Sequence, residues 1–331
     1  MIVHAYATAS HYRAHILPIL DALPPEVRGR FHAPRHIEGG APGIPTGRAL
    51  VASWADLHTV RKRGGECIFV EHGAGQTYSG KGERSPAYSG GDRREGVVLY
   101  LVPSETVAQR CRETQPDVPV AVIGTPPYLD RFLTARDLGH GAPETVGADR
   151  ETAGQASRAT IALSFHAPYN IVPEAGWAWP HYRSAIEALA REGTYRLLGH
   201  GHPRAWPKLE PWWRKIGVEP VRDFCDVLAL QPDLYVIDNS STGPEAAACG
   251  IPVLWLNAPQ HRRDVEHGGR FFDWPRGQVQ VDGPGDLADG IKAALFDPPE
   301  VQVAREAMVA EVYGFTDGRS TERAVEAIMH L

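Results

Sequence analysis

The stretch LYVIDNSSTGPEAAACGIPVLWLN, residues 234–257, predicts a strand, a polar turn, a helix and a second strand in immediate succession. Its first apolar run ends at Asp238, and an alanine-rich helix starts near Thr242. Gly250 and Pro252 end that helix before the next apolar run. Strands joined through a helix run parallel, and parallel strands covered on both faces have continuous apolar runs. The stretch therefore predicts an α/β fold with a parallel sheet.

The same alternation continues on both sides of this stretch. Runs rich in Val, Ile and Leu alternate with helix-like segments over most of the 331 residues. We expect strands near 2–7, 48–53, 66–71, 96–102 and 118–123, and then near 159–164, 194–199, 218–221, 234–238, 252–256 and 278–281. A single core usually divides beyond about 250–300 residues, so we expect two domains.

One segment, DLGHGAPETVGADRETAGQAS, has no apolar period and is the linker candidate at 137–157. We expect an N-terminal Rossmann-like domain, for the acceptor, over 1–136 and a C-terminal Rossmann-like domain, for a nucleotide donor, over 158–305. Helical patterns over 306–331 suit helices that pack back on the N-terminal domain. Ligands of open parallel sheets bind beyond the carboxyl ends of the strands. Two such edges would face a central cleft.

The composition excludes several classes of protein. The formal net charge of −6 disfavours broad attraction to nucleic acid. The four cysteines form no CxxC pair, so neither a zinc site nor a disulfide framework is indicated. No apolar run approaches the roughly 18 residues of a transmembrane helix, and MIVHAYATAS has no leader pattern. We expect a cytoplasmic protein without a transmembrane segment, for which peripheral membrane contact stays open.

The turn between the two strands of the opening stretch is the strongest candidate site. Asp238 ends the strand, and Ser240, Ser241 and Thr242 precede the helix, where unpaired N–H groups and small hydroxyls suit a phosphate. Thr242 and Glu245 also fit a capping box, in which the two residues satisfy backbone donors without a ligand. Glu245 could instead accept hydrogen bonds from ribose hydroxyls.

Two further stretches place histidines after predicted strands. In YRLLGHGHPRAW, residues 195–206, His200 and His202 follow a strand, and a third metal ligand at readable spacing is missing. We therefore expect no metal and assign His202 to phosphate and His200 to the border of the cleft. In SFHAPYN, Ser164 and His166 follow the first strand of the second domain, where they could touch a diphosphate.

The stretch FVEHGAGQTY, residues 69–78, has a histidine at the end of a predicted strand. Most histidines are structural or solvated, but one at a strand end can titrate near neutrality and take a proton from an acceptor hydroxyl. We therefore predict His72 as the catalytic base. Glu71, Gly73 and Gln76 would line the cleft beside it.

The stretch VIGTPPYLDRF, residues 122–132, is a strand followed by Gly124, Thr125 and two prolines. Gly124 and Thr125 either border the cleft or lead towards the linker.

Together these stretches resemble the GT-B superfamily, and within it the CDP-glycerol glycerophosphotransferase family, the teichoic-acid-polymerase-like enzymes. The likeness rests on VEHGAGQTY, on GTPPYLD at 124–130, on His202-Pro203 and on DNSSTGPEAAACGIPV. The resemblance implies a cytoplasmic, metal-independent transferase without a cofactor. It would use a CDP- or UDP-linked sugar or glycerol donor and a hydroxyl-bearing acceptor. It also implies that His72 is the base and that His202, Ser240 and Ser241 hold the donor phosphates.

The opening stretch is also similar to UDP-N-acetylglucosamine 2-epimerases. Those enzymes have Gly-Gly where this chain has Ser240-Ser241, and Glu-Glu where it has Pro244-Glu245. An epimerase-like sugar-nucleotide isomerase and a non-catalytic nucleotide-sugar binder therefore stand as alternatives.

Overall fold

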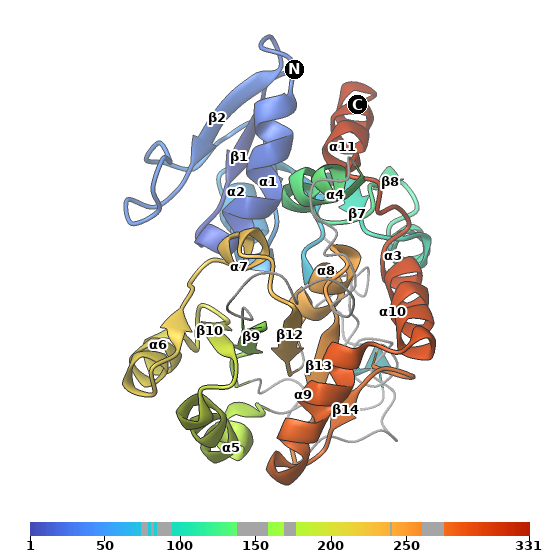
Figure 1. Cartoon of the computed structure of the whole chain (residues 1–331). Helices are drawn as coiled ribbons and strands as arrows, with labels where there is room; N and C mark the ends of the chain where they lie inside the picture. The colour runs from blue at the N-terminus through green and yellow to red at the C-terminus, as the bar shows by residue number, and fades with distance from the viewer. Residues whose placement is uncertain are drawn as a thin grey trace. The chain divides into compact units, whose positions relative to one another are not determined.

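The computed structural model describes residues 1–73, 79–80, 83–84, 95–137, 158–168, 177–238, 240–259 and 275–331. Residues 138–157 of the predicted linker lie outside these ranges. The chain divides into two compact units, unit 1 with Met1–Thr134 and Ala310–Leu331, and unit 2 with Ala135–Val309. Each unit has its own six-stranded sheet (Figure 1). The predicted fold class, two Rossmann-like parallel-sheet domains, is confirmed.

The sheet of unit 1 has the strand order β2-β1-β3-β4-β7-β8, with all neighbours parallel. Its strands are β1 Val3–Tyr6, β2 Arg28–His32, β3 Arg48–Val51, β4 Glu66–Val70, β7 Val97–Val102 and β8 Val120–Val122. A short antiparallel pair, β5 Ser79–Gly80 and β6 Glu83–Arg84, forms separately. The sequence did not predict β2. It is an edge strand with one buried residue, Phe31, so it lacks the apolar run of its neighbours.

The helices of unit 1 cover its sheet and include the end of the chain. They are α1 Ser10–Ala22, α2 Trp54–Arg61, α3 Glu105–Thr114, the 3₁₀ turn η2 Pro127–Leu129, α4 Asp130–Asp137 and α11 Ser320–Met329. α4 and α10, Pro299–Val312, each continue across a boundary between the units. Ala324 and Ile328 of α11 share one core cluster with Ile16 and Ile19 of α1. The last helix therefore completes the core of unit 1.

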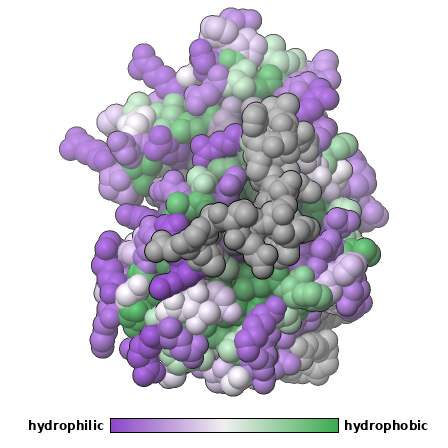
Figure 2. Space-filling model, viewed as in Figure 1, coloured by the Kyte–Doolittle hydropathy of each residue, from purple (hydrophilic) through white to green (hydrophobic). Residues whose placement is uncertain are grey.

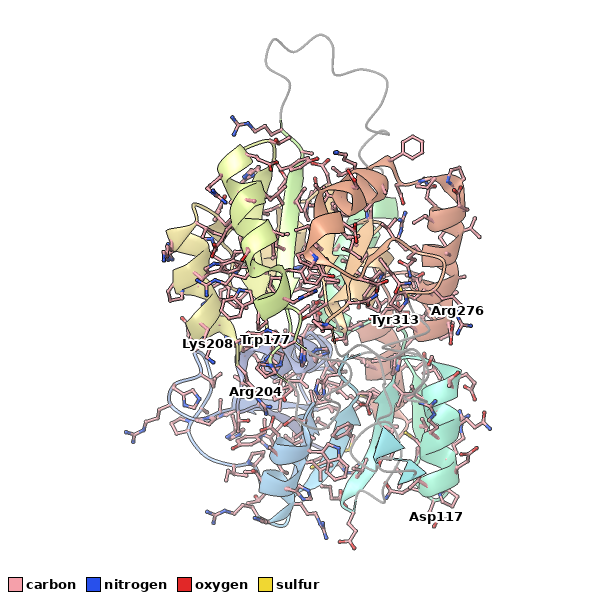
Figure 3. All side chains as sticks on the ribbon, turned by 90° about the horizontal axis from the view of Figure 1, so that it is seen from below. Asp117, Trp177, Arg204, Lys208, Arg276 and Tyr313 are labelled. Atoms are coloured by element: carbon pink, nitrogen blue, oxygen red, sulfur yellow. The ribbon has the colours of Figure 1, made fainter. Side chains whose placement is uncertain are left out.

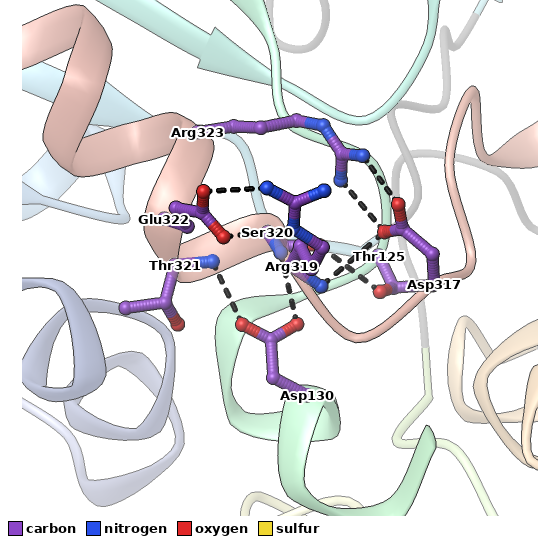
Figure 4. Close-up of polar contacts among 8 residues, drawn as sticks. All are labelled: Thr125, Asp130, Asp317, Arg319, Ser320, Thr321, Glu322 and Arg323. Atoms are coloured by element: carbon purple, nitrogen blue, oxygen red, sulfur yellow. Dashed lines mark hydrogen bonds and ion pairs between the residues drawn. The ribbon is translucent and has the colours of Figure 1, made fainter. Parts of the chain in front are cut away.

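A carboxylate far away in the sequence fixes the start of α11. Asp130 accepts hydrogen bonds from the backbone N–H groups of Ser320, at 3.1 Å, and Thr321, at 2.7 Å (Figure 4). A carboxylate in this place satisfies donors that the first turn of a helix leaves unpaired. Asp130 thus caps α11 across 190 residues of sequence.

Gly124 and Thr125 take part in the same attachment. The backbone N–H of Thr125 donates to Phe315 O at 3.0 Å, and the Thr125 and Ser320 hydroxyls are 3.2 Å apart. Gly124 has φ +94°, and a Cβ there would lie 2.4 Å from Phe315 O, so only glycine fits. Both residues are buried and contact the C-terminal segment of their own unit. They attach the C-terminal segment to the end of β8, and their place at the border of a cleft stays a prediction.

The sheet of unit 2 has the order β11-β10-β9-β12-β13-β14, again parallel throughout. Its strands are β9 Thr160–Phe165, β10 Arg196–Gly201, β11 Glu219–Pro220, β12 Leu234–Ile237, β13 Val253–Leu256 and β14 Gln280–Val281. Numbered along the chain within the unit, this is the doubly wound order 3-2-1-4-5-6. The order reverses between β9 and β12, which is where such sheets bind ligands.

The helices of unit 2 pack around this sheet. They are α5 Trp179–Glu192, α6 Trp206–Lys215, α7 Phe224–Ala229, α8 Thr242–Ala248, the 3₁₀ turn η4 Pro284–Asp286 and α9 Leu287–Phe296. Trp213 is fully buried, and a Cβ on Gly199 would lie 2.4 Å from its ring. Half-buried Trp177 lies with its ring centre 5.8 Å from Lys208 Nζ (Figure 3). The described tryptophans Trp177, Trp179, Trp206, Trp212 and Trp213 all belong to or pack against the core of this unit.

The surface combines polar and apolar side chains. On the face drawn in Figure 2, hydrophilic groups are interspersed with small apolar areas. Among the residues that the structure describes, no helix has both the length and the apolar character needed to cross a membrane.

Candidate functional site

The strand ends that the sequence singled out meet at the reversal point of the unit 2 sheet. Ser164, near the end of β9, is in register with Ile237 of β12 on one side and with His200 of β10 on the other. The residues that follow these strands, His166, His202 and the turn after Asp238, therefore share one edge of the sheet.

Asp238 shapes this edge. Its carboxylate accepts the backbone N–H of His166 at 2.7 Å and that of Ala178 at 3.2 Å. These two residues lie at the start and the end of the connection from β9 to α5, so one side chain fixes both ends. Asp238 is only 2% exposed. It supports the edge from inside the unit.

His166 and His202 lie side by side, with ring centroids 4.6 Å apart, and both are half-buried. His202 Nδ1 accepts the N–H of Arg204 at 3.1 Å, so the neutral ring has its proton on Nε2. His166 Nδ1 lies 2.9 Å from Ala167 O, and a carbonyl only accepts, so this neutral ring has its proton on Nδ1. Backbone contacts thus make Nε2 a donor in His202 and an acceptor in His166.

His200 has a different environment. It is 6% exposed, and its Nδ1 lies 3.0 Å from Val221 O at the neighbouring strand β11. Burial lowers the pKa of this imidazole, so its neutral form is favoured. His200 therefore packs inside unit 2, and its place at the border of a cleft stays a prediction. Among the described residues, no group of three or more His, Cys, Asp or Glu side chains is placed to hold a metal ion.

The hydroxyls of the β12–α8 turn are ordered by a buried phenol. Tyr235 donates from its hydroxyl to Thr242 Oγ1 at 2.9 Å, and Thr242 Oγ1 donates to Ser240 Oγ at 3.1 Å. Burial raises the pKa of Tyr235, so the phenol keeps its proton. Tyr235 of β12 and Thr242 at the start of α8 are thus linked by hydrogen bonds to Ser240 of the turn, the turn predicted to hold phosphate.

The capping-box alternative for Thr242 and Glu245 is wrong. The N–H of Glu245 donates to Ser241 O at 3.3 Å, the side chain of the N-cap residue Ser241 makes no cap hydrogen bond, and the N–H of Thr242 donates to Ser240 Oγ at 3.4 Å. Glu245 is 2% exposed, whereas Ser240, Ser241 and Thr242 are half-buried. The three hydroxyl residues are therefore the accessible part of the turn.

In unit 1, His72 follows β4 and is half-buried, whereas Glu71 is 7% exposed and donates from its N–H to Leu101 O at 2.8 Å. Gly73 is buried with φ +71°. Glu71 and Gly73 therefore shape the backbone here, and their place beside a cleft stays a prediction. Gln76 lies outside the described residues. Among residues 69–73, His72 alone is not fully buried.

The structure adds residues that the sequence did not single out. The ring of Tyr12 meets that of His72 at 4.9 Å and 77°, and His15 lies behind it. At the end of β1, Thr8 Oγ1 donates to the buried Asp56 at 2.7 Å. Burial raises the pKa of Asp56. The spacing of Tyr12 and His15 is helical, but nothing in the sequence pairs their helix with the end of β4.

No family model matches the chain, and no curated protein matches its sequence. Solved structures with similar folds include a variant of the wall teichoic acid polymerase TagF, with a TM-score of 0.63 and 12% identity over 100% of this chain and 88% of that one. The UDP-GlcNAc 2-epimerase of Neisseria meningitidis has a TM-score of 0.62 and 13% sequence identity over 100% of both chains. The UDP-GlcNAc 2-epimerase of Methanocaldococcus jannaschii has a TM-score of 0.59 and 13% sequence identity, also over 100% of both chains.

The two groups of neighbours are those that the sequence motifs resemble, so the expected resemblance is confirmed at the level of fold. Similarity at these identities extends to the fold alone. The chain has the GT-B fold, with a Rossmann-like sheet in each unit.

Proposed function

We propose that this protein is a transferase that moves a glycosyl or glycerophosphoryl group from a nucleotide-diphosphate donor to an acceptor hydroxyl. One observation carries the proposal. At the reversal point of the unit 2 sheet, two oriented imidazoles and three accessible hydroxyl residues share one edge. Such an edge suits a ligand rich in oxygen atoms, and a nucleotide diphosphate is the form that the GT-B fold favours.

The donor would be held by unit 2. His202 Nε2–H and the hydroxyls of Ser240, Ser241 and Thr242 would donate to diphosphate oxygens, and His166 Nε2 would accept from a donor hydroxyl or, when protonated, donate to phosphate. Donors aimed at the leaving phosphate stabilise the charge that grows on it, which needs no metal or cofactor. Glu245 is buried in the structure, so its suggested contact with ribose has less support than these assignments.

The acceptor would be activated by His72 of unit 1. In the transfer, His72 takes the proton of the acceptor hydroxyl, and the acceptor oxygen forms a bond to the anomeric carbon of a sugar or to the phosphorus of glycerophosphate. The bond from that atom to the bridging oxygen of the donor breaks, and the nucleotide leaves with the electron pair.

A ligand panel tests the donor site. We expect CDP or UDP and their glycerol or sugar conjugates to raise the Tm, because a ligand that binds only the native state stabilises it by about 2.7 kcal/mol at a hundredfold excess over Kd. The shift should be lost in His202→Ala and kept in the matched control His330→Ala, whose side chain is exposed. Absence of any shift with CDP, UDP, GDP, ADP and their conjugates would contradict the proposal.

An incubation without acceptor separates the proposed transferase from an epimerase. Purified protein is mixed with UDP-N-acetylglucosamine alone, and the products are separated by chromatography. A transferase leaves the sugar nucleotide essentially unchanged, whereas release of an epimer or of free sugar would favour the epimerase.

A further inference from the structure

Two aromatic side chains of unit 1 lie against the imidazole of His72, and a third lies against one of these two. The Tyr12 ring lies edge to face with it, at a centroid distance of 4.9 Å and an interplanar angle of 77°. The His15 ring lies at 6.0 Å and 72°. Behind His15, the ring of Tyr128 is perpendicular to it at 5.2 Å and 90°. Tyr12 and His15 are three residues apart on α1 and so share one face of that helix.

This arrangement has a rigid base. His15 is 7% exposed and its ring lies against those of both His72 and Tyr128, so it has little room to change its rotamer. Burial, followed by repulsion from His11, lowers the pKa of His15 to about 3. His15 is therefore uncharged near neutral pH. It adds no positive charge that would oppose protonation of His72.

The backbone constrains the direction of the His72 side chain less than a strand would. His72 follows the last residue of β4, and the next residue, Gly73, has φ +71°. Outside the strand, the pleat no longer dictates the direction of the side chain. Edge-to-face contacts prefer defined ring orientations, so the neighbouring rings can supply what the backbone does not.

We propose that Tyr12 and His15 are positioning residues that fix the ring plane of His72 for the transfer reaction. The inference rests on the proposed function of His72 as the base. Both residues act through the His72 ring, and Tyr128 supports His15 from the η2 turn. A base whose reacting nitrogen is displaced by about 1 Å can lose on the order of a hundredfold in rate, so the effect should be measurable.

Matched variants test the inference. Tyr12→Leu and His15→Leu remove an aromatic edge, whereas Tyr12→Phe and His15→Phe keep an uncharged ring of similar shape. We expect each Leu variant to lower kcat by about tenfold or more with the donor KM unchanged, and each Phe variant to retain most of kcat. Melting curves and donor-induced Tm shifts identify any variant that does not fold.

A second measurement does not need activity. In protein labelled with ¹⁵N-histidine, with His72→Gln used for assignment, the ring nitrogen shifts of His72 report its tautomer. We expect one dominant tautomer in the wild type and in the Phe variants, and a mixture in the Leu variants. Unchanged nitrogen shifts in both folded Leu variants would overturn the inference. Full activity of His72→Gln would instead overturn the role of His72 as the base, and the nitrogen shifts would still decide whether Tyr12 and His15 orient its ring.

Discussion

Burial separates the histidines of the two candidate sites into two groups. His15 and His200 are 7% and 6% exposed, and burial lowers the pKa of each. His72, His166 and His202 are half-buried at the ends of strands. The first group is held neutral inside its unit, whereas the side chains of the second group are partly exposed. The sequence places all five near strand ends or helices but does not distinguish the groups.

A pH titration of stability tests the state of His15. Its pKa of about 3 in the folded protein lies below the ordinary value of 6.5, so its contribution is complete above pH 6.5 and is lost as the pH falls towards 3. The loss is roughly 1.4 kcal/mol per pH unit, or on the order of 3 kcal/mol between pH 7 and pH 4. The wild type should therefore lose about 3 kcal/mol more free energy of unfolding than His15→Leu between pH 7 and pH 4, as measured by urea unfolding. In the control His36→Leu, where the side chain is exposed, the wild-type dependence should persist.

At the scale of elements, single carboxylates join segments that the sequence keeps apart. Asp238 holds both ends of the β9–α5 connection, and Asp130 caps α11. In each case the aspartate accepts two backbone N–H groups. These contacts are strong because the acceptor is charged, and each determines where a neighbouring element begins.

Replacing Asp238 should loosen the edge that carries His166. Asp238→Ala removes two charge-assisted hydrogen bonds, so we expect a loss of roughly 3 kcal/mol or more in the free energy of unfolding and a smaller Tm shift with the donor. Asp238→Asn retains one acceptor oxygen and should show an intermediate loss. Equal stability of Asp238→Ala and the wild type in urea unfolding would rule out this role.

Replacing Asp130 tests the cap of α11. Loss of a helix N-cap typically costs about 0.5–2 kcal/mol, so we expect a destabilisation of that size in Asp130→Ala. Asp117→Ala is the control, because Asp117 is exposed (Figure 3). Hydrogen exchange should show faster opening of Ser320–Met329 in Asp130→Ala and not in the control. Equal protection of α11 in both variants would speak against the cap.

The residues of the fold and the site were predictable to different extents. Apolar runs located most strands, because buried parallel strands need them, but not the charged edge strand β2. The sequence correctly predicts a turn between β12 and α8 at Ser240. It also suggests a helix cap at Thr242, because it does not show that the Thr242 hydroxyl accepts a hydrogen bond from Tyr235. Thr125 pairs with Ser320 across 195 residues, and one sequence gives no signal for such a contact.

On the scale of the whole molecule, the same kind of hydrogen bond to a buried aspartate occurs in both units. In each sheet a buried aspartate links the two strand ends at the point where the strand order changes direction. Asp56, after β3, receives the hydroxyl of Thr8 after β1, and Asp238, after β12, receives the N–H of His166 after β9. Each unit thus shapes its own edge before any ligand binds.

Because each unit has its own edge, donor binding and turnover should be separable. We expect His72→Ala to keep the donor-induced Tm shift and to lose about 10²- to 10⁴-fold in kcat, the usual contribution of a general base. His202→Ala should lose the Tm shift itself. Calorimetric binding of the donor and turnover assays on the two variants make the comparison. If His72→Ala abolished donor binding, the assignment of separate roles to the two units would be wrong.

The position of α11 has a consequence for synthesis on the ribosome. Unit 2 consists of one continuous segment, Ala135–Val309, whereas unit 1 needs Ala310–Leu331 as well as the residues that emerge first. All of unit 2 is therefore synthesised before Ala324 and Ile328, which cover the apolar face of α1. The segment Met1–Thr134, which is translated before unit 2, thus gains its full core only after Ala310–Leu331 has also been made.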